Sequence, residues 1–337
     1  MARTLSYMKA INEALAQEMD RDPSVVVFGE DVAGGAGTSQ PMDAWGGVFG
    51  LTKGLWEKFP DRVLDTPISE SAIMGAAAGA AVSGLRPVAE LMFIDFLGVC
   101  FDQIFNQAAK FRYMFGGKTR TPMVVRTCYG AGAGAAAQHS QTLYNIFTNI
   151  PGLKVVVPSS PYDAKGLLTA AIRDDDPVIF CEHKALYGVR GEVPTELYEV
   201  PLGQANVVRE GTDVTVVALG QMVPRAQRAA EALQGEGVGV EVVDPRTTSP
   251  LDEATILASV TRTGRCVVVD EGYPRCGMGT DLVSLVATRG PRLRAPIGLV
   301  TPPHTPVPFA HVLEEAYLPG PDEIAAAVRT TLEPVDA

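Results

Sequence analysis

The sequence predicts an α/β protein built from two three-layer α/β/α domains. Short runs rich in valine and isoleucine alternate with helix-like segments along most of the 337 residues. These runs are apolar throughout, which is typical of parallel strands covered on both faces. The pattern stops between residues 184 and 203, where two prolines and no hydrophobic period occur. We therefore expect a domain over residues 1–186, a linker over 187–203 and a second domain over 204–337.

In the first domain, helix and strand patterns follow one another in a regular order. Apolar residues at helical spacing predict a helix over 4–20, and "PSVVVFGED" predicts a strand after it. A glycine-rich loop, a helix near 52–59, a strand at "DRVLDT" and an Ala/Gly-rich helix over about 70–83 follow. The remaining segments are a strand "RPVAELMF", a helix "FDQIFNQAAKFRYMFGG", a strand "TPMVVRTCY", a loop "GAGAGAAAQHSQ", a strand "LKVVVPSS", a helix "PYDAKGLLTAAIRDDD" and a strand "PVIFCEH".

The second domain repeats this alternation. The segment "PRTTSPLDEATILASV" has a turn, a proline, acids in a first turn and an apolar stripe, in the order that begins a helix. The tail "PGPDEIAAAVRTTLE" predicts a last helix. The expected strands are "DVTVVAL", "VGVEVVD", "RCVVVDE" and "PIGLVT".

Composition excludes several classes of protein. The net charge of −11 argues against nucleic acid or an anionic membrane as partner. The five cysteines form no CxxC pair, so we expect reduced thiols and neither a disulfide framework nor a zinc site. No apolar run approaches the roughly 20 residues of a membrane helix, and the N-terminus lacks a signal-peptide pattern. We expect a cytoplasmic protein.

Familiar nucleotide motifs do not fit. The glycines of "GAGAGAAA" never give G-x-G-x-x-G, and "RYMFGGKT" has Arg112 where a P-loop needs its first glycine. No serine occupies a G-x-S-x-G elbow. Dinucleotide, P-loop and α/β-hydrolase sites are therefore disfavoured.

Three chemically capable side chains follow predicted strands: Glu70, Phe96 and His139. Ligands bind at the carboxyl ends of strands in open parallel sheets, so these residues are candidates for one site. Glu70 opens a helix of small and apolar residues. On a surface it would only stabilise the helix start, by about 0.3–1 kcal/mol. At the mouth of a pocket it would be a catalytic carboxylate.

A set of motifs in one order resembles the β subunits of thiamine-diphosphate-dependent 2-oxo acid dehydrogenases. The resemblance covers essentially the whole chain and implies a transketolase-type pyrimidine-binding domain followed by a transketolase C-terminal-type domain. The matching stretches are "GEDV", "DTPISE", "GLRPVAE", "FDQIFNQAAKFRYMFGG", "AAQHSQ", "PGLKVVVPSSPYDAKGLL", "DPRTTSPLD" and "VVVDE".

The resemblance implies roles for individual residues. Glu70 would bond to the aminopyrimidine ring of thiamine diphosphate, in a water-poor pocket that strengthens this bond. His139 would exchange a proton on the substrate side. The cofactor-binding residues would be Glu30, Ile68, Glu70, Met92 and Phe96.

The resemblance also implies partners, because this family anchors the diphosphate and magnesium through a G-D-G motif that the chain lacks. An α subunit would supply that motif in an α2β2 assembly, and a lipoyl acyltransferase would accept the product. A structural potassium ion would lie at Ala171, Asp174 and Asp176.

Within this family, the stretch "AGGAGTSQPMDAWGGVFGLTKGL" is most similar to acetoin dehydrogenase β subunits. The expected reaction is cleavage of acetoin to acetaldehyde, with transfer of an acetyl unit to a lipoyl group. A β subunit for pyruvate or branched-chain 2-oxo acids is one alternative, and a non-catalytic docking scaffold is another. A self-contained transketolase-like enzyme is disfavoured by the missing G-D-G.

Overall fold

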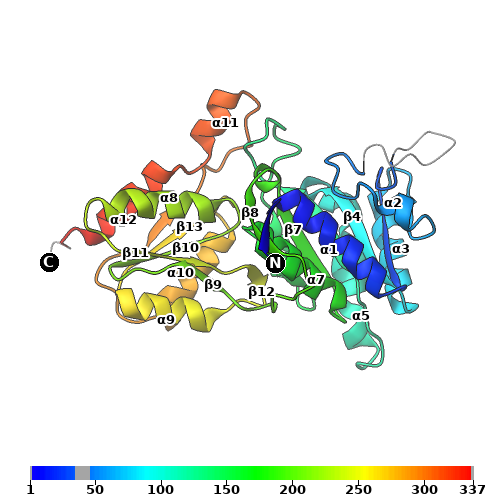
Figure 1. The fold of residues 1–337 in the computed structure, drawn as a ribbon. Coiled ribbons are helices and arrows are strands. Elements are labelled where there is room, and N and C mark those ends of the chain that lie inside the picture. The colour runs from blue at the N-terminus through cyan, green and yellow to red at the C-terminus, as the bar shows by residue number, and fades with distance from the viewer. Residues whose placement is uncertain (1, 35–45, 335–337) are drawn as a thin grey trace. The chain divides into compact units, whose positions relative to one another are not determined.

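The computed structural model describes residues 2–34 and 46–334. The chain forms two compact units, which are Met1–Tyr129 with Ile146–Leu202, and Gly130–Asn145 with Gly203–Ala337. Residues 130–145, which the sequence pattern places in the first domain, thus group with the second unit. Each unit is a sheet with helices on its faces, so the predicted α/β class is confirmed (Figure 1).

The first unit is built on parallel strands in the order β6-β7-β5-β4-β2-β3. β2, β5 and β7 consist mainly of valine, isoleucine and other buried residues, as expected for strands covered on both faces. The strands are β2 (Val25–Gly29), β3 (Val63–Asp65), β4 (Arg86–Phe93), β5 (Val124–Tyr129), β6 (Lys154–Val156) and β7 (Val178–His183).

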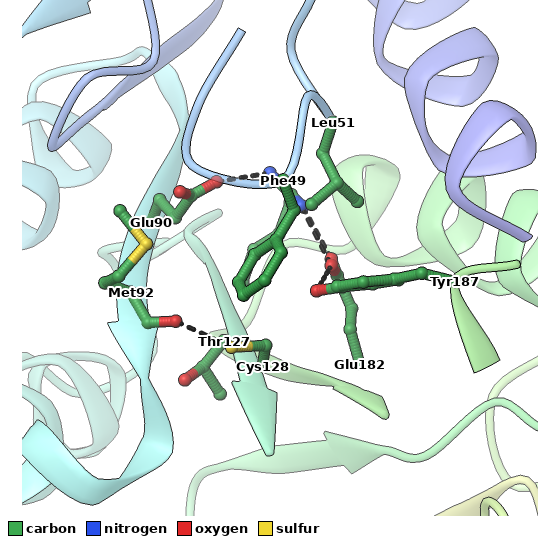
Figure 2. A pocket seen from close by; sticks show the side chains of 9 residues that line it. Phe49, Leu51, Glu90, Met92, Thr127, Cys128, Glu182 and Tyr187 are labelled. Carbon is green, nitrogen blue, oxygen red and sulfur yellow. Dashed lines mark hydrogen bonds and ion pairs between the residues drawn. The ribbon is translucent and has the colours of Figure 1, made fainter. Parts of the chain in front are cut away.

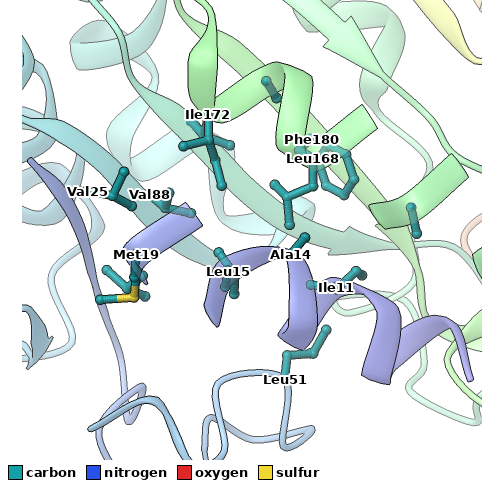
Figure 3. Close-up of a cluster of buried hydrophobic side chains, with 14 of the residues drawn as sticks. Ile11, Ala14, Leu15, Met19, Val25, Leu51, Val88, Leu168, Ile172 and Phe180 are labelled. Carbon is teal, nitrogen blue, oxygen red and sulfur yellow. The ribbon is translucent and has the colours of Figure 1, made fainter. Parts of the chain in front are cut away.

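Helices α1 and α7 cover one face of this sheet. Figure 3 shows Ile11, Leu15 and Met19 of α1 facing Leu168 and Ile172 of α7 in one apolar core. α3 packs against β4, and alternate strand residues outside the α1/α7 core are also buried, so the other face is covered too. The helical elements are α1 (Tyr7–Arg21), α2 (Leu55–Lys58), α3 (Glu70–Val82), η1 (Ile94–Phe96), α4 (Leu97–Asp102), η2 (Gln103–Ala108), α5 (Ala109–Met114), α6 (Tyr144–Thr148), α7 (Pro161–Arg173) and η3 (Lys184–Leu186).

Two elements differ from the sequence pattern. The predicted helix over 4–20 is preceded by a strand, β1 (Ala2–Ser6), which pairs antiparallel with β8 (Arg190–Pro194). Both strands lie in stretches without strand periodicity, and the pairing spans most of the first unit, so no local signal reveals it. The helix predicted over 101–117 is divided into α4, a π-helical turn η2 and α5.

The second unit contains a sheet in the order β14-β13-β10-β11-β9, parallel except for the edge strand β9. α8 and α12 share an apolar core with this sheet, while α9 and α10 contact β10 and β13. The elements are β9 (Asn206–Arg209), β10 (Val214–Ala218), α8 (Met222–Gln234), β11 (Val240–Asp244), β12 (Thr247–Ser249), α9 (Glu253–Thr263), β13 (Cys266–Val269), α10 (Met278–Arg289), β14 (Gly298–Val300), α11 (His311–Tyr317) and α12 (Pro321–Leu332).

Candidate functional site

Three predicted site residues follow neighbouring strands of the first unit. Glu30 comes directly after β2, Glu70 opens α3 shortly after β3, and Phe96 closes η1 directly after β4. β4, β2 and β3 are adjacent and parallel, so their carboxyl ends meet at one edge of the sheet. The structure therefore brings these residues to the same edge, where ligands bind in open α/β sheets.

Glu70 is held by the way α3 packs. The hydroxyl of Ser71 donates a hydrogen bond to the carbonyl of Val99 on α4, which ties the first turn of α3 to its neighbour. A Cβ at Gly75 would lie 3.2 Å from the side-chain amide oxygen of Gln103, so the glycine lets α3 and η2 approach closely. The small residues of α3 therefore serve close helix packing, and Glu70 at its start is half-buried.

Carboxylates gather around Glu30. Burial raises the pKa of Glu30, and the charges of Asp31 and Glu70 raise this pKa further. Burial also raises the pKa of the Cys100 thiol to about 12, with a second contribution from the charge of Glu70. Glu70 thus acts electrostatically on both Glu30 and Cys100, which places its carboxylate among them at the sheet edge.

A row of aromatic rings leads from Phe96 into the unit. The ring of Phe96 meets that of Phe93 edge to face at 5.6 Å between centroids, and Phe93 meets Phe49 in the same way at 6.0 Å. Phe49 in turn lies 5.4 Å from the ring of Tyr187. The Lys184 ammonium lies 5.5 Å from the centroid of Phe93. These ring contacts fix the position of Phe96, which the sequence predicts to bind the cofactor.

Of the two other predicted cofactor residues, Met92 is buried on β4, whereas Ile68 is 67 % exposed in the loop before α3. An apolar side chain so exposed beside a carboxylate is available to a ligand or a partner. Met92 is therefore packed inside the unit, whereas the side chain of Ile68 is accessible to a ligand or a partner.

Beneath this edge lies an ionic cluster that sequence reasoning missed. The guanidinium of Arg126 on β5 donates two hydrogen bonds to Glu182 on β7, at 2.7 and 2.9 Å, and one to Glu90 on β4, at 2.9 Å. The Tyr187 hydroxyl donates to Glu182 at 3.0 Å. Figure 2 shows Glu182 and Tyr187 facing each other beneath the loop of Phe49. The available signal was a charged residue in the interior of each of three mostly apolar parallel strands.

The pKa values in this cluster follow from burial and pairing. Burial raises the pKa of Glu90, which outweighs the opposing attraction of Arg126. The pKa of Arg126 is raised because Glu182 and Glu90 together outweigh its burial. The cavity between these side chains holds about 10 Å³, roughly the room of one water molecule. It is therefore a structural gap, and a substrate must bind outside it.

His139 lies in the second compact unit, on the loop between β5 and α6. It is half-buried, and its backbone N–H donates to the carbonyl of Ala136 at 3.4 Å. Gly130, Gly132 and Gly134 all have positive φ, which explains why glycine recurs at every second position of this loop. The predicted cooperation of His139 with Glu70 stays a prediction, because the two residues belong to different units.

The predicted potassium site has cationic neighbours. The Lys154 ammonium donates to the Asp174 carboxylate at 2.6 Å, and Arg112 donates to that of Asp176 at 2.6 Å. The carbonyl of Ala171 accepts from the Asp174 N–H at 3.3 Å. Within residues 2–34 and 46–334, no group of three His, Cys, Asp or Glu side chains is arranged to hold a metal ion. In the same ranges, no helix is long and apolar enough to cross a membrane.

Comparisons with known proteins agree with this architecture. Residues 3–190 match the transketolase pyrimidine-binding domain, and residues 203–324 match the transketolase C-terminal domain. A solved structure described as a split-gene transketolase, inactive beta4 tetramer, superposes with a TM-score of 0.77 at 25 % identity, covering 97 % of this chain and 98 % of that chain. Fold and site thus define a two-domain protein of the transketolase type.

Full-length relatives identify the family to which the chain belongs within this class. The chain is 63 % identical to the acetoin:2,6-dichlorophenolindophenol oxidoreductase subunit beta of Cupriavidus necator, over 99 % of both chains. It is 58 % identical to the protein of the same name from Bacillus subtilis, over 99 % of this chain and 98 % of that one. The 2-oxoisovalerate dehydrogenase subunit beta of Bacillus subtilis is 44 % identical over 98 % and 99 %. The chain belongs to this family of acetoin oxidoreductase and 2-oxo acid dehydrogenase β subunits, which confirms the resemblance drawn from its motifs.

Proposed function

We propose that this chain is the β subunit of a thiamine-diphosphate-dependent acetoin dehydrogenase. The reaction breaks the bond between the carbonyl and carbinol carbons of acetoin, releases one half as acetaldehyde and oxidises the other half to an acetyl unit. A lipoyl disulfide on an acyltransferase is reduced as it accepts this unit, so atoms and electrons balance. Two full-length relatives named for acetoin, at 63 % and 58 % identity, support this choice.

The residues at the sheet edge fit the aminopyrimidine part of thiamine diphosphate. Such a ring needs a carboxylate at its N1′ atom and flat or apolar contacts on its faces. Glu70 offers the carboxylate, Phe96 an aromatic ring and Met92 a thioether, from the carboxyl ends of β3 and β4, which flank β2 in the sheet. This convergence is the observation that carries the proposal. Ile68 and Glu30 complete the proposed contacts.

When bound, thiamine diphosphate supplies the carbon nucleophile that attacks the carbonyl of acetoin. Glu70 holds the proton at the N1′ atom of the pyrimidine and orients the ring. Half-burial of Glu70 limits competition from water for this hydrogen bond. His139 moves a proton to or from the substrate oxygen, the role that a histidine performs best near neutral pH.

An α subunit completes the site in this proposal. One face of α3 is exposed but carries no charge, and it is formed by Ala72, Ala76, Gly79 and Val82. Val99 on the neighbouring α4 is 61 % exposed. An uncharged apolar surface beside a half-buried carboxylate is typical of a protein interface. The sequence contains no G-D-G, so the α subunit would also hold the diphosphate and magnesium, in an α2β2 assembly.

The proposal also includes the domain boundaries at residues 186 and 204, docking of a lipoyl acyltransferase and a potassium ion at Ala171, Asp174 and Asp176. The ion's ligands would be mainly backbone carbonyls, since Lys154 and Arg112 already pair with the two carboxylates. All five cysteines are free thiols, which supports a cytoplasmic location.

Substrate choice is tested by assay of the reconstituted αβ complex with an artificial electron acceptor. We expect a higher kcat/KM with acetoin than with pyruvate or a branched-chain 2-oxo acid. The reverse order would assign the chain to one of those alternatives. Part of the stretch that favours acetoin, residues 35–45, lies outside the described residues.

A further inference from the structure

The loop that carries His139 is anchored by buried carboxylates of the second unit. The backbone N–H of Gly132 donates to one carboxylate oxygen of Glu314 at 2.8 Å, and that of Gly134 donates to the other at 3.0 Å. The N–H of Ala131 donates to Glu271 at 2.6 Å. Three backbone donors of one short loop therefore point at two acids that lie far away in the sequence.

Both acids are almost inaccessible to water. Glu314 on α11 is 2 % exposed and Glu271, just after β13, is 4 % exposed. Hydrogen bonds from N–H groups to a carboxylate are about twice as strong as those between neutral groups. A buried carboxylate that lost them would be left without compensation, so the loop is held in the conformation that supplies them.

Two further contacts fix the ends of the loop. The Thr142 hydroxyl donates to Glu271 at 3.4 Å, to the same oxygen that accepts from Ala131, so Glu271 closes the base of the loop. Ala131 also packs in an apolar cluster with Val307, Tyr317 and Leu318, from α11 and its neighbourhood. The positive φ values of Gly132 and Gly134 turn their N–H groups toward Glu314.

We propose that Glu314 is a positioning residue that acts on catalysis through His139. The two carboxylate oxygens of Glu314 fix the backbone at Gly132 and Gly134. This part of the loop precedes His139, so its conformation sets the position of the imidazole. This inference rests on the proposed role of His139. Glu314 does not touch substrate in this scheme; its removal lets the loop adopt other conformations and displaces the imidazole.

The test is a double-mutant cycle in the reconstituted αβ complex. Glu314→Ala should lower kcat for acetoin by about ten- to a hundredfold, since small displacements of catalytic groups cost this much. The KM for acetoin should change little. Glu314→Gln, which keeps one acceptor oxygen, should recover part of kcat. Glu315→Gln is the matched control, because Glu315 lies next to Glu314 and its side chain is 72 % exposed.

The decisive comparison uses the His139→Ala background. If Glu314 acts through His139, Glu314→Ala should cause no further loss of kcat there. An equal fall in both backgrounds would overturn the positioning role and leave His139 catalytic. Full activity of His139→Ala alone would instead remove the proposed role of the histidine. If Glu314→Ala does not assemble, the same cycle with Glu314→Gln gives the answer.

Discussion

The guanidinium of Arg126 lies 2.9 Å from the carboxylate of Glu90, and both side chains are buried in the first unit's sheet. Glu182 binds the same guanidinium from the other side, so one cation joins β4, β5 and β7. These strands include the one that ends at Phe93, before the ring of Phe96. The cluster therefore sets the relative position of strands whose ends form the proposed site.

Replacing Arg126 should unfold the chain more easily. Arg126→Met leaves Glu90 and Glu182 as uncompensated buried acids, and breaking a buried ion pair in this way costs about 3–5 kcal/mol. Urea unfolding measures this change. Arg120→Met is the matched control: Arg120 pairs with Asp175 at 3.1 Å but is 69 % exposed, so its loss should cost less than about 1 kcal/mol. Equal midpoints for the two variants would contradict the role of the cluster.

Glu30 should make stability depend on pH. Its pKa is raised in the folded chain, so the folded state holds the proton more tightly than the unfolded state does. The stability from this group is present below its unfolded pKa, near 4.5, and is lost as pH rises through the folded value.

Glu30→Gln removes the loss of folding stability that ionisation of Glu30 causes as pH rises. Relative to the unchanged chain, we expect the variant to gain roughly 0.5 kcal/mol between pH 4 and pH 7, a small figure because water screens a half-exposed group. Parallel urea titrations at the two pH values measure it. A difference that stays constant or falls with pH would contradict the burial of Glu30 beside Asp31 and Glu70, which raises its pKa.

The exposed face of α3 should bind the α subunit. Ala76→Arg places a charge at the centre of this uncharged face, so association should weaken by at least about tenfold, because an unpaired charge at an interface core is costly. The chain itself should stay folded, since Ala76 is exposed. Ala232→Arg on α8, also an exposed helical alanine, is the control. Titration calorimetry with the α chain measures both, and unchanged affinity for Ala76→Arg would place the interface elsewhere.

Potassium should stabilise the chain if the predicted ion binds near Ala171. The melting temperature should then be higher in potassium chloride than in sodium chloride at equal ionic strength, because a ligand that binds only the folded state stabilises it. Asp174→Ala should reduce this difference. Equal melting temperatures in the two salts would contradict the predicted potassium ion.

The sequence predicted the fold class and the strand-end positions of Glu70 and Phe96, because apolar runs and turn residues are local signals, whereas Glu30 was named only by the family resemblance. It missed β1, whose partner β8 lies far along the chain and gives no local pattern. It also missed Arg126, because a single charge in an apolar strand does not reveal which acids will face it. Likewise Glu314 carries no local sign that it binds the glycines of a distant loop.

The central claim is that Glu70 activates the cofactor and is more than a helix-start acid. Glu70→Gln keeps the side-chain shape and should lose at most about 1 kcal/mol of helix stabilisation. Glu253→Gln is the matched control, since Glu253 is also the first residue of a helix, α9.

The most direct measurement is the kcat for acetoin of the αβ complex that contains Glu70→Gln, with assembly and melting temperature checked alongside. The account predicts normal assembly and a fall in kcat of about a hundredfold or more, the usual size of a lost proton-transfer group, while Glu253→Gln stays active. A Glu70→Gln complex that turns over acetoin at nearly the unchanged rate would contradict it.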